Sequence, residues 1–250
     1  MSSSGAKTLP QRAIEPVKRP KRRSKWGSLL LILGIGLLVT GLGLSGYVAW
    51  EMFGTSIGSQ RDYQNQVNDM ERQWAEDLPP IDPRVEAAAV EQAQQSGNGS
   101  VVARGFAILR IPDFGANWQV PILAGIDTAT LKHGVGWYPQ SALPGEIGNF
   151  VIAGHRITNG EPFKNLLKLP KGALVIVETA DTVYTYQLLD SPKNLTVQET
   201  ESWIMLPNPF DRTSVATRAI ATLITCTDLF HSSNRSVGFA ELIKTEPKSS

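Results

Sequence analysis

The sequence has 250 residues, a formal net charge of +1 and 42% hydrophobic residues, which is typical of a globular protein with one or two hydrophobic cores. This composition excludes a collagen-like chain and a fully disordered chain, and a single cysteine excludes a disulfide-rich scaffold. The charge is uneven, because the first 26 residues are strongly basic and the remainder is slightly acidic.

An apolar segment follows this basic tail. Residues 1–26 contain eight lysines and arginines and one glutamate, whereas residues 27–50 contain no charged residue. About 24 residues at about 1.5 Å each form a helix of about 36 Å, which is long enough to span a lipid bilayer. The basic tail predicts a cytoplasmic N-terminus and an extracellular remainder, and this topology explains the tail without nucleic-acid binding. A cleaved signal peptide is the alternative, but its apolar region would be shorter, and Tyr47 and Trp50 suit a membrane interface.

Residues 51–103 are expected to form an extracytoplasmic stalk and linker. Val67, Met70 and Trp74 stand at helical spacing among charged residues, which predicts a helix that continues out of the membrane. Residues 78–100 combine prolines, an Ala/Gln run and a Gly/Ser/Asn end. This composition is typical of a linker with one or two helical turns.

Residues 104–245 are expected to form the folded domain. Short apolar runs such as GFAILRIP, NFVIAG, ALVIVET and AIATLITC recur every ten to twenty residues between Gly, Pro, Asn and Asp. Several of these runs alternate with period two, which predicts an all-β domain, either a mostly antiparallel barrel or a sandwich. Short helices are expected near residues 127–132 and 162–169.

The only cysteine, Cys226, ends an apolar run, and Arg235 begins the next strand nine positions later. If the two strands form a hairpin, these residues face each other across its open end. The guanidinium would then stabilise a thiolate and donate hydrogen bonds to an oxyanion. The alternatives are a buried, unreactive thiol and a solvated loop arginine.

A cysteine nucleophile also requires a base, and the chain has three histidines. His155 follows the apolar run NFVIAG, at a strand end next to a polar loop, where catalytic side chains are usually displayed. His231 lies in the loop after the cysteine, and His133 follows a short helical segment. His155 is the preferred base, and a structural role for it is the alternative.

These motifs resemble the sortases, the membrane-anchored cysteine transpeptidases of Gram-positive bacteria. The family signature combines TLxTC, a later arginine and a histidine on an earlier strand, and this sequence has TLITC at 222–226, NRS at 234–236 and AGHR at 153–156. The resemblance covers residues 104–243 and extends to class E sortases of actinobacteria through GVGWYPQSALPGEIGNFVIAGHR and ITNGEPF. Asp228 departs from that class, which often has proline there, and GWYP stands in place of GHYP.

The resemblance implies a closed β-barrel of about eight strands with short helices, preceded by one transmembrane helix. It implies that Cys226, His155 and Arg235 are catalytic. Thr225, Tyr138 and Phe230 are candidate substrate-binding residues. The alternatives are an ordinary β-branched strand residue for Thr225 and an aromatic cover on the barrel for Tyr138.

The implied reaction cleaves an LPxTG-like or LAxTG-like sorting signal of an exported protein between Thr and Gly. The acyl group passes to an amine of a peptidoglycan precursor or a pilin, without metal or organic cofactor. The alternatives are an inert membrane-tethered binding domain, a different Cys/His wall enzyme and a pilin-polymerising class C sortase. Class C members often carry an Asp-Pro-aromatic lid, but here Asp82 and Pro83 precede Arg84, so the aromatic plug is missing and a lid function stays open.

Overall fold

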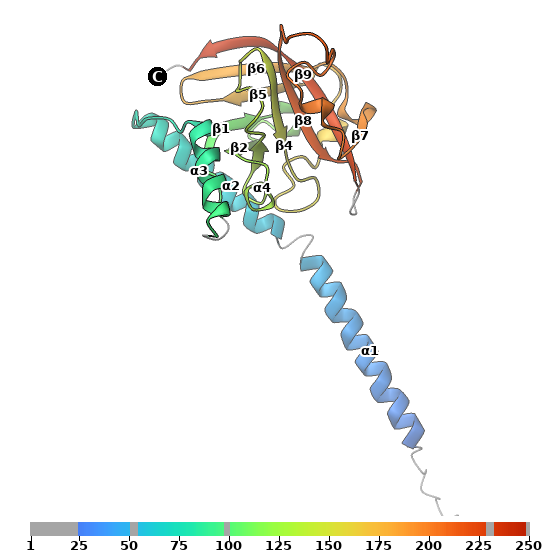
Figure 1. Ribbon diagram of the computed structural model, residues 1–250. Helices are drawn as coiled ribbons and strands as arrows, with labels where there is room; N and C mark the ends of the chain where they lie inside the picture. The colour runs from blue at the N-terminus through green and yellow to red at the C-terminus, as the bar shows by residue number, and fades with distance from the viewer. Residues whose placement is uncertain (1–24, 51–54, 98–100, 229–232, 249–250) are drawn as a thin grey trace, which may run out of the picture. The chain divides into compact units, whose positions relative to one another are not determined.

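The computed structural model describes residues 25–50, 55–97, 101–228 and 233–248 (Figure 1). The chain divides into two compact units, residues 1–47 and 48–250, and each is described by itself. The first unit contains helix α1 (Lys25–Ala49), in which Trp26–Val48 has a mean hydropathy of 2.2 and no buried residue. This helix is long and apolar enough to cross a bilayer, a property that membrane anchors and signal sequences share.

The second unit is built on a closed β-barrel. Its strands are β1 (Gly105–Arg110), β2 (Gln119–Ala124), β3 (Val135–Trp137), β4 (Gly148–Ala153), β5 (Leu174–Glu178), β6 (Thr182–Leu188), β7 (Thr196–Gln198), β8 (Ala219–Cys226) and β9 (Asn234–Pro247). They follow the order β6-β5-β1-β2-β3-β4-β8-β9-β7, and pairing of β6 with β9 closes eight of them into a barrel. The predicted barrel is confirmed, and β7 is an additional short strand on the first residues of β9.

Most strand pairs are antiparallel, and two pairs are parallel. β2 is parallel to β3, and β4 is parallel to β8. The first parallel connection contains the short helix α4 (Thr128–Leu131), whose first turn is capped by the Asp127 carboxylate. This helix lies in the segment where the sequence predicts one. The remaining short helices are single 3₁₀ turns: η2 (Pro112–Phe114), η3 (Leu166–Lys168), η4 (Pro192–Asn194) and η5 (Ser202–Met205).

The barrel interior is filled by aliphatic and aromatic side chains. Trp137, Phe150 and Tyr186 are the largest fully buried side chains in the described part of the chain. Trp137 lies edge-on to Phe106, with ring centroids 5.6 Å apart, and its indole N–H donates to the Ala142 carbonyl at 2.9 Å. Burying each such side chain contributes about 1.5–3 kcal/mol, so this core holds the strand ends that carry the site.

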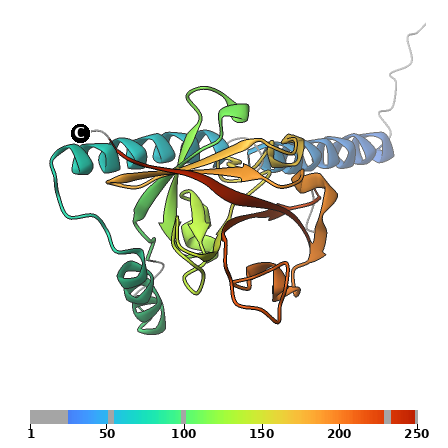
Figure 2. The same ribbon diagram turned by 90° about the horizontal axis from the view of Figure 1, so that it is seen from above.

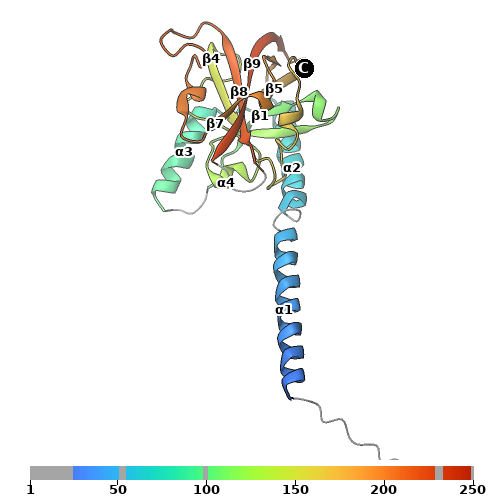
Figure 3. The same cartoon turned by 90° about the vertical axis from the view of Figure 1, so that its right-hand side faces the viewer.

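Two helices precede the barrel and pack on it (Figures 1 and 3). α2 (Thr55–Ala75) confirms the helix predicted from the spacing of Val67, Met70 and Trp74, and this stripe packs against β1 and β2. Figure 2 shows the end of β9 beside the last turn of α2, where the Lys248 ammonium lies 4.3 Å from the Trp74 ring centroid.

α3 (Pro83–Gln95) is longer than the one or two turns expected, with 13 residues. Its Ala/Gln-rich sequence has high helix propensity, and the Asp82 carboxylate accepts a hydrogen bond from the Arg84 N–H at 2.8 Å as an N-cap. Glu86 is buried and paired with Arg104 at 2.7 Å, which lowers the pKa of Glu86 against the effect of its burial. The composition of residues 78–100 therefore led to a helix that was predicted too short, because the N-cap and the Glu86–Arg104 pair that stabilise it are not visible as a pattern in the sequence.

Candidate active site

Two parallel strands set His155 beside Cys226. In the β4–β8 pair, Ala153 is the partner of Ile224, and the Gly154 N–H continues the ladder by donating to the Ile224 carbonyl at 3.1 Å. His155 follows Gly154 directly, and Cys226 lies two residues beyond Ile224 on β8. The β4–β8 pairing therefore brings the chain segments that carry the two residues to neighbouring strands, which lie about 4.8 Å apart.

β9 places Arg235 on the opposite side of Cys226 from His155. β8 and β9 are antiparallel, and Cys226 is the direct partner of Arg235. Directly opposed side chains project from the same face, with Cβ atoms about 4.5–5.5 Å apart. The hairpin predicted from the sequence is therefore present, and its register pairs Cys226 with Arg235, while His155 follows the end of the neighbouring strand β4.

The hydroxyl of Thr225 joins the cysteine strand to the histidine strand. Thr225 is 2% exposed, and its hydroxyl donates to the Gly154 carbonyl at 2.8 Å. This bond links the residue before Cys226 with the residue before His155. The structure thus places Thr225, a candidate substrate-binding residue, in a buried contact between β8 and the residue that follows β4.

His155 is largely enclosed by protein. Burial lowers the pKa of His155 below its ordinary value because it disfavours the imidazolium, and the positive charge of Lys132 lowers it further. The Nε2 atom is buried and has no hydrogen-bond partner among the described residues. A neutral imidazole with an unpaired nitrogen is suited to accept a proton from a thiol or an amine.

Arg235 is oriented by an acidic residue that sequence reasoning missed. The Glu199 carboxylate lies 2.6 Å from the Arg235 guanidinium, and the two side chains are 51% and 25% exposed. Glu199 follows β7, and β7 pairs with the start of β9, where Arg235 lies. This pairing places Glu199 next to Arg235. No motif in the sequence marks Glu199, because its position depends on this strand pairing.

Arg156, directly after His155, was also missed. Its guanidinium donates to the carbonyl of Cys226 at 3.4 Å and to the carbonyl of Thr227. These contacts hold the backbone where the chain leaves β8 after the cysteine. Its position directly after His155 in the motif AGHR could have identified Arg156 from the sequence as a candidate site residue.

The comparisons with known proteins agree with this geometry. The family model described as the sortase domain matches residues 109–243. The chain belongs to the sortase family. Sortase SrtE1 of Streptomyces coelicolor is 26% identical over 258 aligned residues, an alignment that covers 98% of this chain and 66% of that relative.

Solved structures of class E sortases are also similar to this sortase. Sortase E from Streptomyces avermitilis is 34% identical, with a TM-score of 0.53, over 59% of this chain and 93% of that one. Sortase E1 from Streptomyces coelicolor, with a tripeptide in its active site, is 29% identical, with a TM-score of 0.50, over 59% of this chain and 94% of that one. The predicted resemblance to sortases, including class E, is confirmed.

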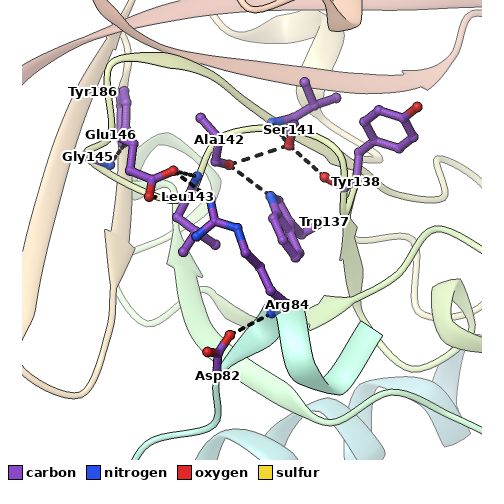
Figure 4. Close-up of polar contacts among 11 residues, drawn as sticks. Asp82, Arg84, Trp137, Tyr138, Ser141, Ala142, Leu143, Gly145, Glu146 and Tyr186 are labelled. Carbon is purple, nitrogen blue, oxygen red and sulfur yellow. Dashed lines mark hydrogen bonds and ion pairs between the residues drawn. The ribbon is translucent and has the colours of Figure 1, made fainter. Parts of the chain in front are cut away.

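The remaining candidate residues of this sortase are Tyr138 and Phe230, together with the histidines His133 and His231. Tyr138 follows β3, and its side chain points away from the neighbouring polar network (Figure 4). With Pro139, Asp127 and residues of α3, it lines a groove of about 370 Å³. Phe230 and His231 lie outside the described residues. His133 is half-buried, with its Nδ1 2.6 Å from the Asp62 carboxylate.

The segment between β3 and β4, which leads to His155, is held by α3 and by the barrel wall. Arg84 lies 3.0 Å from Glu146, and the Glu146 carboxylate accepts a hydrogen bond from the Leu143 N–H at 2.7 Å (Figure 4). The Gly145 N–H donates to the Tyr186 hydroxyl oxygen at 2.7 Å. Arg84, at the position of the missing aromatic plug, therefore supports a loop of the barrel.

Proposed function

We propose that this sortase is a membrane-anchored cysteine transpeptidase that cleaves a sorting signal and transfers the acyl group to an amine. The observation that carries the proposal is the pairing of Cys226 with Arg235 on strands β8 and β9, and it is supported by the pairing of β8 with β4, the strand that His155 follows. The unpaired Nε2 of His155 supports a role in proton transfer. The tripeptide in the active site of the similar sortase E1 supports a peptide as the substrate class.

In the first half-reaction, the sulfur of Cys226 attacks the carbonyl carbon of the Thr residue in an LPxTG-like or LAxTG-like signal. The thiol proton passes to the neutral imidazole of His155, whose lowered pKa favours that form at rest. The guanidinium of Arg235 donates hydrogen bonds to the oxyanion that forms. Collapse breaks the Thr–Gly amide bond, and the imidazolium gives its proton to the leaving glycine amine, which leaves a thioester on Cys226.

In the second half-reaction, an amine of a cell-wall precursor or of another protein attacks the thioester carbon. His155 accepts the proton that the amine loses and returns it to the departing Cys226 sulfur. One amide bond is broken and one is formed, so the transfer requires no external energy source. Glu199 holds Arg235 in place, and Thr225 and Arg156 hold the backbone on either side of the reacting pair.

The apolar helix α1 of the first unit supports a location of this reaction at the membrane. α1 would serve as the membrane anchor, and the basic residues before it would remain in the cytoplasm, with the barrel outside. An anchored enzyme at the outer surface meets both the exported substrate and a lipid-linked acceptor. Membrane attachment therefore contributes to the proposed function by raising the local concentration of the two substrates.

The experiment uses the full chain in detergent micelles with LPxTG and LAxTG peptides, with and without an amine. We expect cleavage between Thr and Gly and an amine-dependent ligation product by mass spectrometry. Both are expected to disappear in Cys226→Ala and to fall strongly in His155→Gln. No product with either peptide, together with a thiol that resists alkylation in the folded protein, would instead support an inert binding domain.

A further inference from the structure

Helix α2 lies outside residues 109–243, which the sortase family model matches, yet it packs on the barrel. Val67 and Met70 are buried and cluster with Ile108 of β1. The Met70 sulfur occupies the space above Gly105, where an added Cβ would lie 2.6 Å from it. These contacts hold the second half of the helix against the barrel, and residues 62–66, one to two turns earlier, contact two loops.

Tyr63, in the first half of α2, reaches the loop that follows His155. Its side chain is 2% exposed, and its hydroxyl donates to the Asn159 carbonyl. The ring covers Gly160, since a Cβ added at that glycine would lie 2.6–2.9 Å from the ring and its hydroxyl. The tip of the loop is therefore built against one tyrosine of the preceding helix.

This loop has an unfavourable backbone conformation. Asn159, Gly160 and Glu161 all have positive φ values, of 49°, 77° and 51°. Glycine adopts this left-handed region readily and asparagine tolerates it, but glutamate does not favour it. Such conformations persist only where surrounding contacts hold them, and they cluster at active sites. Tyr63 provides such a contact from outside the loop.

The loop tip is connected to His155 through the backbone. The Phe163 N–H donates to the His155 carbonyl at 3.0 Å, which closes the segment from 155 to 163 onto the histidine. The Phe163 ring, which is fully buried, lies where a Cβ on Gly154 would come within 2.8 Å of it. The two ends of this loop are thus held at His155, and its tip is held by Tyr63.

α2 also holds the segment that follows α4. The Gln66 side-chain amide donates to the His133 carbonyl at 3.0 Å, and the Asp62 carboxylate lies 2.6 Å from the His133 Nδ1. His133 follows Lys132, whose charge acts on His155. The helix therefore contacts the loop that follows His155 and the segment that carries Lys132, a charge that acts on His155.

We propose that α2 is a positioning element for the general acid and base of this sortase, with Tyr63 as the positioning residue that holds the loop after His155. The proposal rests on the role of His155 proposed above. It implies that the segment between the membrane helix and the family domain is part of the catalytic apparatus. Removing the Tyr63 hydroxyl would loosen the loop and allow the imidazole to leave its alignment with the thiol.

The test uses the full chain in detergent micelles and the variant Tyr63→Phe, which keeps the ring and removes only the hydroxyl. The matched control is Arg72→Ala, because Arg72 lies on the exposed side of the same helix, 66% exposed, and pairs only with Asp69 in the described contacts. We expect kcat for peptide transfer to fall about tenfold with KM changed less than about twofold in Tyr63→Phe, and neither to change in the control.

A second readout follows the imidazole itself. The pKa of His155, measured by NMR titration of its ring protons, is expected to rise toward the ordinary value in Tyr63→Phe, because a loosened loop admits water to the ring. A purely structural effect of the substitution would lower Tm without moving this pKa. Gly160→Ala adds a Cβ that would clash with the Tyr63 ring, at a residue with a positive φ. This variant is expected to lower kcat and to raise the pKa of His155, as Tyr63→Phe does.

An unchanged kcat and an unchanged pKa of His155 in Tyr63→Phe would overturn the proposal, while the activity of the wild-type protein would leave the proposed function standing. An equal loss of kcat in the Arg72→Ala control would also overturn it, because the effect would then belong to the helix as a whole. If the wild-type protein transfers no peptide, the proposed function fails, and the NMR titration alone decides whether Tyr63 positions the His155 loop.

Discussion

The bond between the Thr225 hydroxyl and the Gly154 carbonyl offers a direct test of how the two reactive strands are held together. Thr225→Val keeps the size and branching of the side chain and removes the donor. The Gly154 carbonyl, in a buried residue, then loses the hydrogen bond that it accepts at 2.8 Å. Leaving a buried acceptor without its partner costs about 1–3 kcal/mol.

The added methyl group of valine offsets part of this cost, so we expect the free energy of unfolding to fall by about 1–2 kcal/mol. For a unit of this size each kcal/mol lowers Tm by about 2–4 °C, which predicts a decrease of about 2–8 °C. The larger effect is expected in catalysis, because the hydroxyl sets the distance between the strands that carry Cys226 and His155. A small displacement of the reacting groups lowers kcat by about tenfold or more.

The assay is peptide transfer by the full chain in detergent micelles, with thermal unfolding measured in parallel. Thr225→Ser is the matched control, because serine keeps the hydroxyl and loses only a methyl group. It should retain a kcat close to that of the wild-type protein, with a stability loss of about 1 kcal/mol. Equal losses of kcat in Thr225→Ser and Thr225→Val would refute the reasoning, because the hydroxyl would then not be the group that matters.

Three further predictions concern groups around the site. Glu199→Ala removes the ion-pair partner of Arg235 and is expected to lower kcat/KM for the peptide about fivefold, while stability changes by less than about 1 kcal/mol because the pair is partly exposed. Steady-state kinetics and thermal unfolding check this, and an unchanged kcat/KM would contradict it. Because the pKa of His155 is lowered on folding, the unfolded chain binds its proton more tightly, so Tm should fall as the pH drops below the ordinary histidine value of about 6.5 and level off above it. This dependence should be weaker in His155→Gln in melts from about pH 5 to 8, and equal slopes for the two proteins would contradict it. Asp82→Ala removes the N-cap of α3 and should cost about 1 kcal/mol without changing kcat, whereas an increase in kcat would indicate that α3 acts as a lid.

The barrel and the hairpin that pairs Cys226 with Arg235 could be predicted because both depend on local patterns. Apolar runs of four to eight residues with period two define strands wherever they occur, and TLITC and AGHR end two of them. The spacing between Cys226 and Arg235 is short enough for a hairpin, so their register follows from the two neighbouring strands alone. His155 could be chosen as a candidate from its place at a strand end, but local patterns could not predict that β4 pairs with β8, because these strands are far apart in the sequence.

The contacts that sequence reasoning missed all depend on pairings distant in the chain. Glu199 reaches Arg235 because β7 joins the edge of β9, and nothing in the local sequence reveals that pairing. The Ala/Gln run of α3 reads as a linker, because only Ala87 and Val90 of it join the barrel core and the partner of Glu86, Arg104, lies outside the run. Tyr63 contacts a loop 96 residues later, so only the folded structure connects it with His155.

The central claim is that Cys226 forms an acyl-enzyme with the help of His155 and Arg235. The most direct measurement is the intact mass of the full chain after a short incubation with an LPxTG or LAxTG peptide in the absence of an amine. We predict an added mass equal to the peptide acyl group up to Thr, absent in Cys226→Ala and removed when an amine is added. An adduct that persists in Cys226→Ala, or a wild-type protein that remains unmodified by both peptides, would contradict the account.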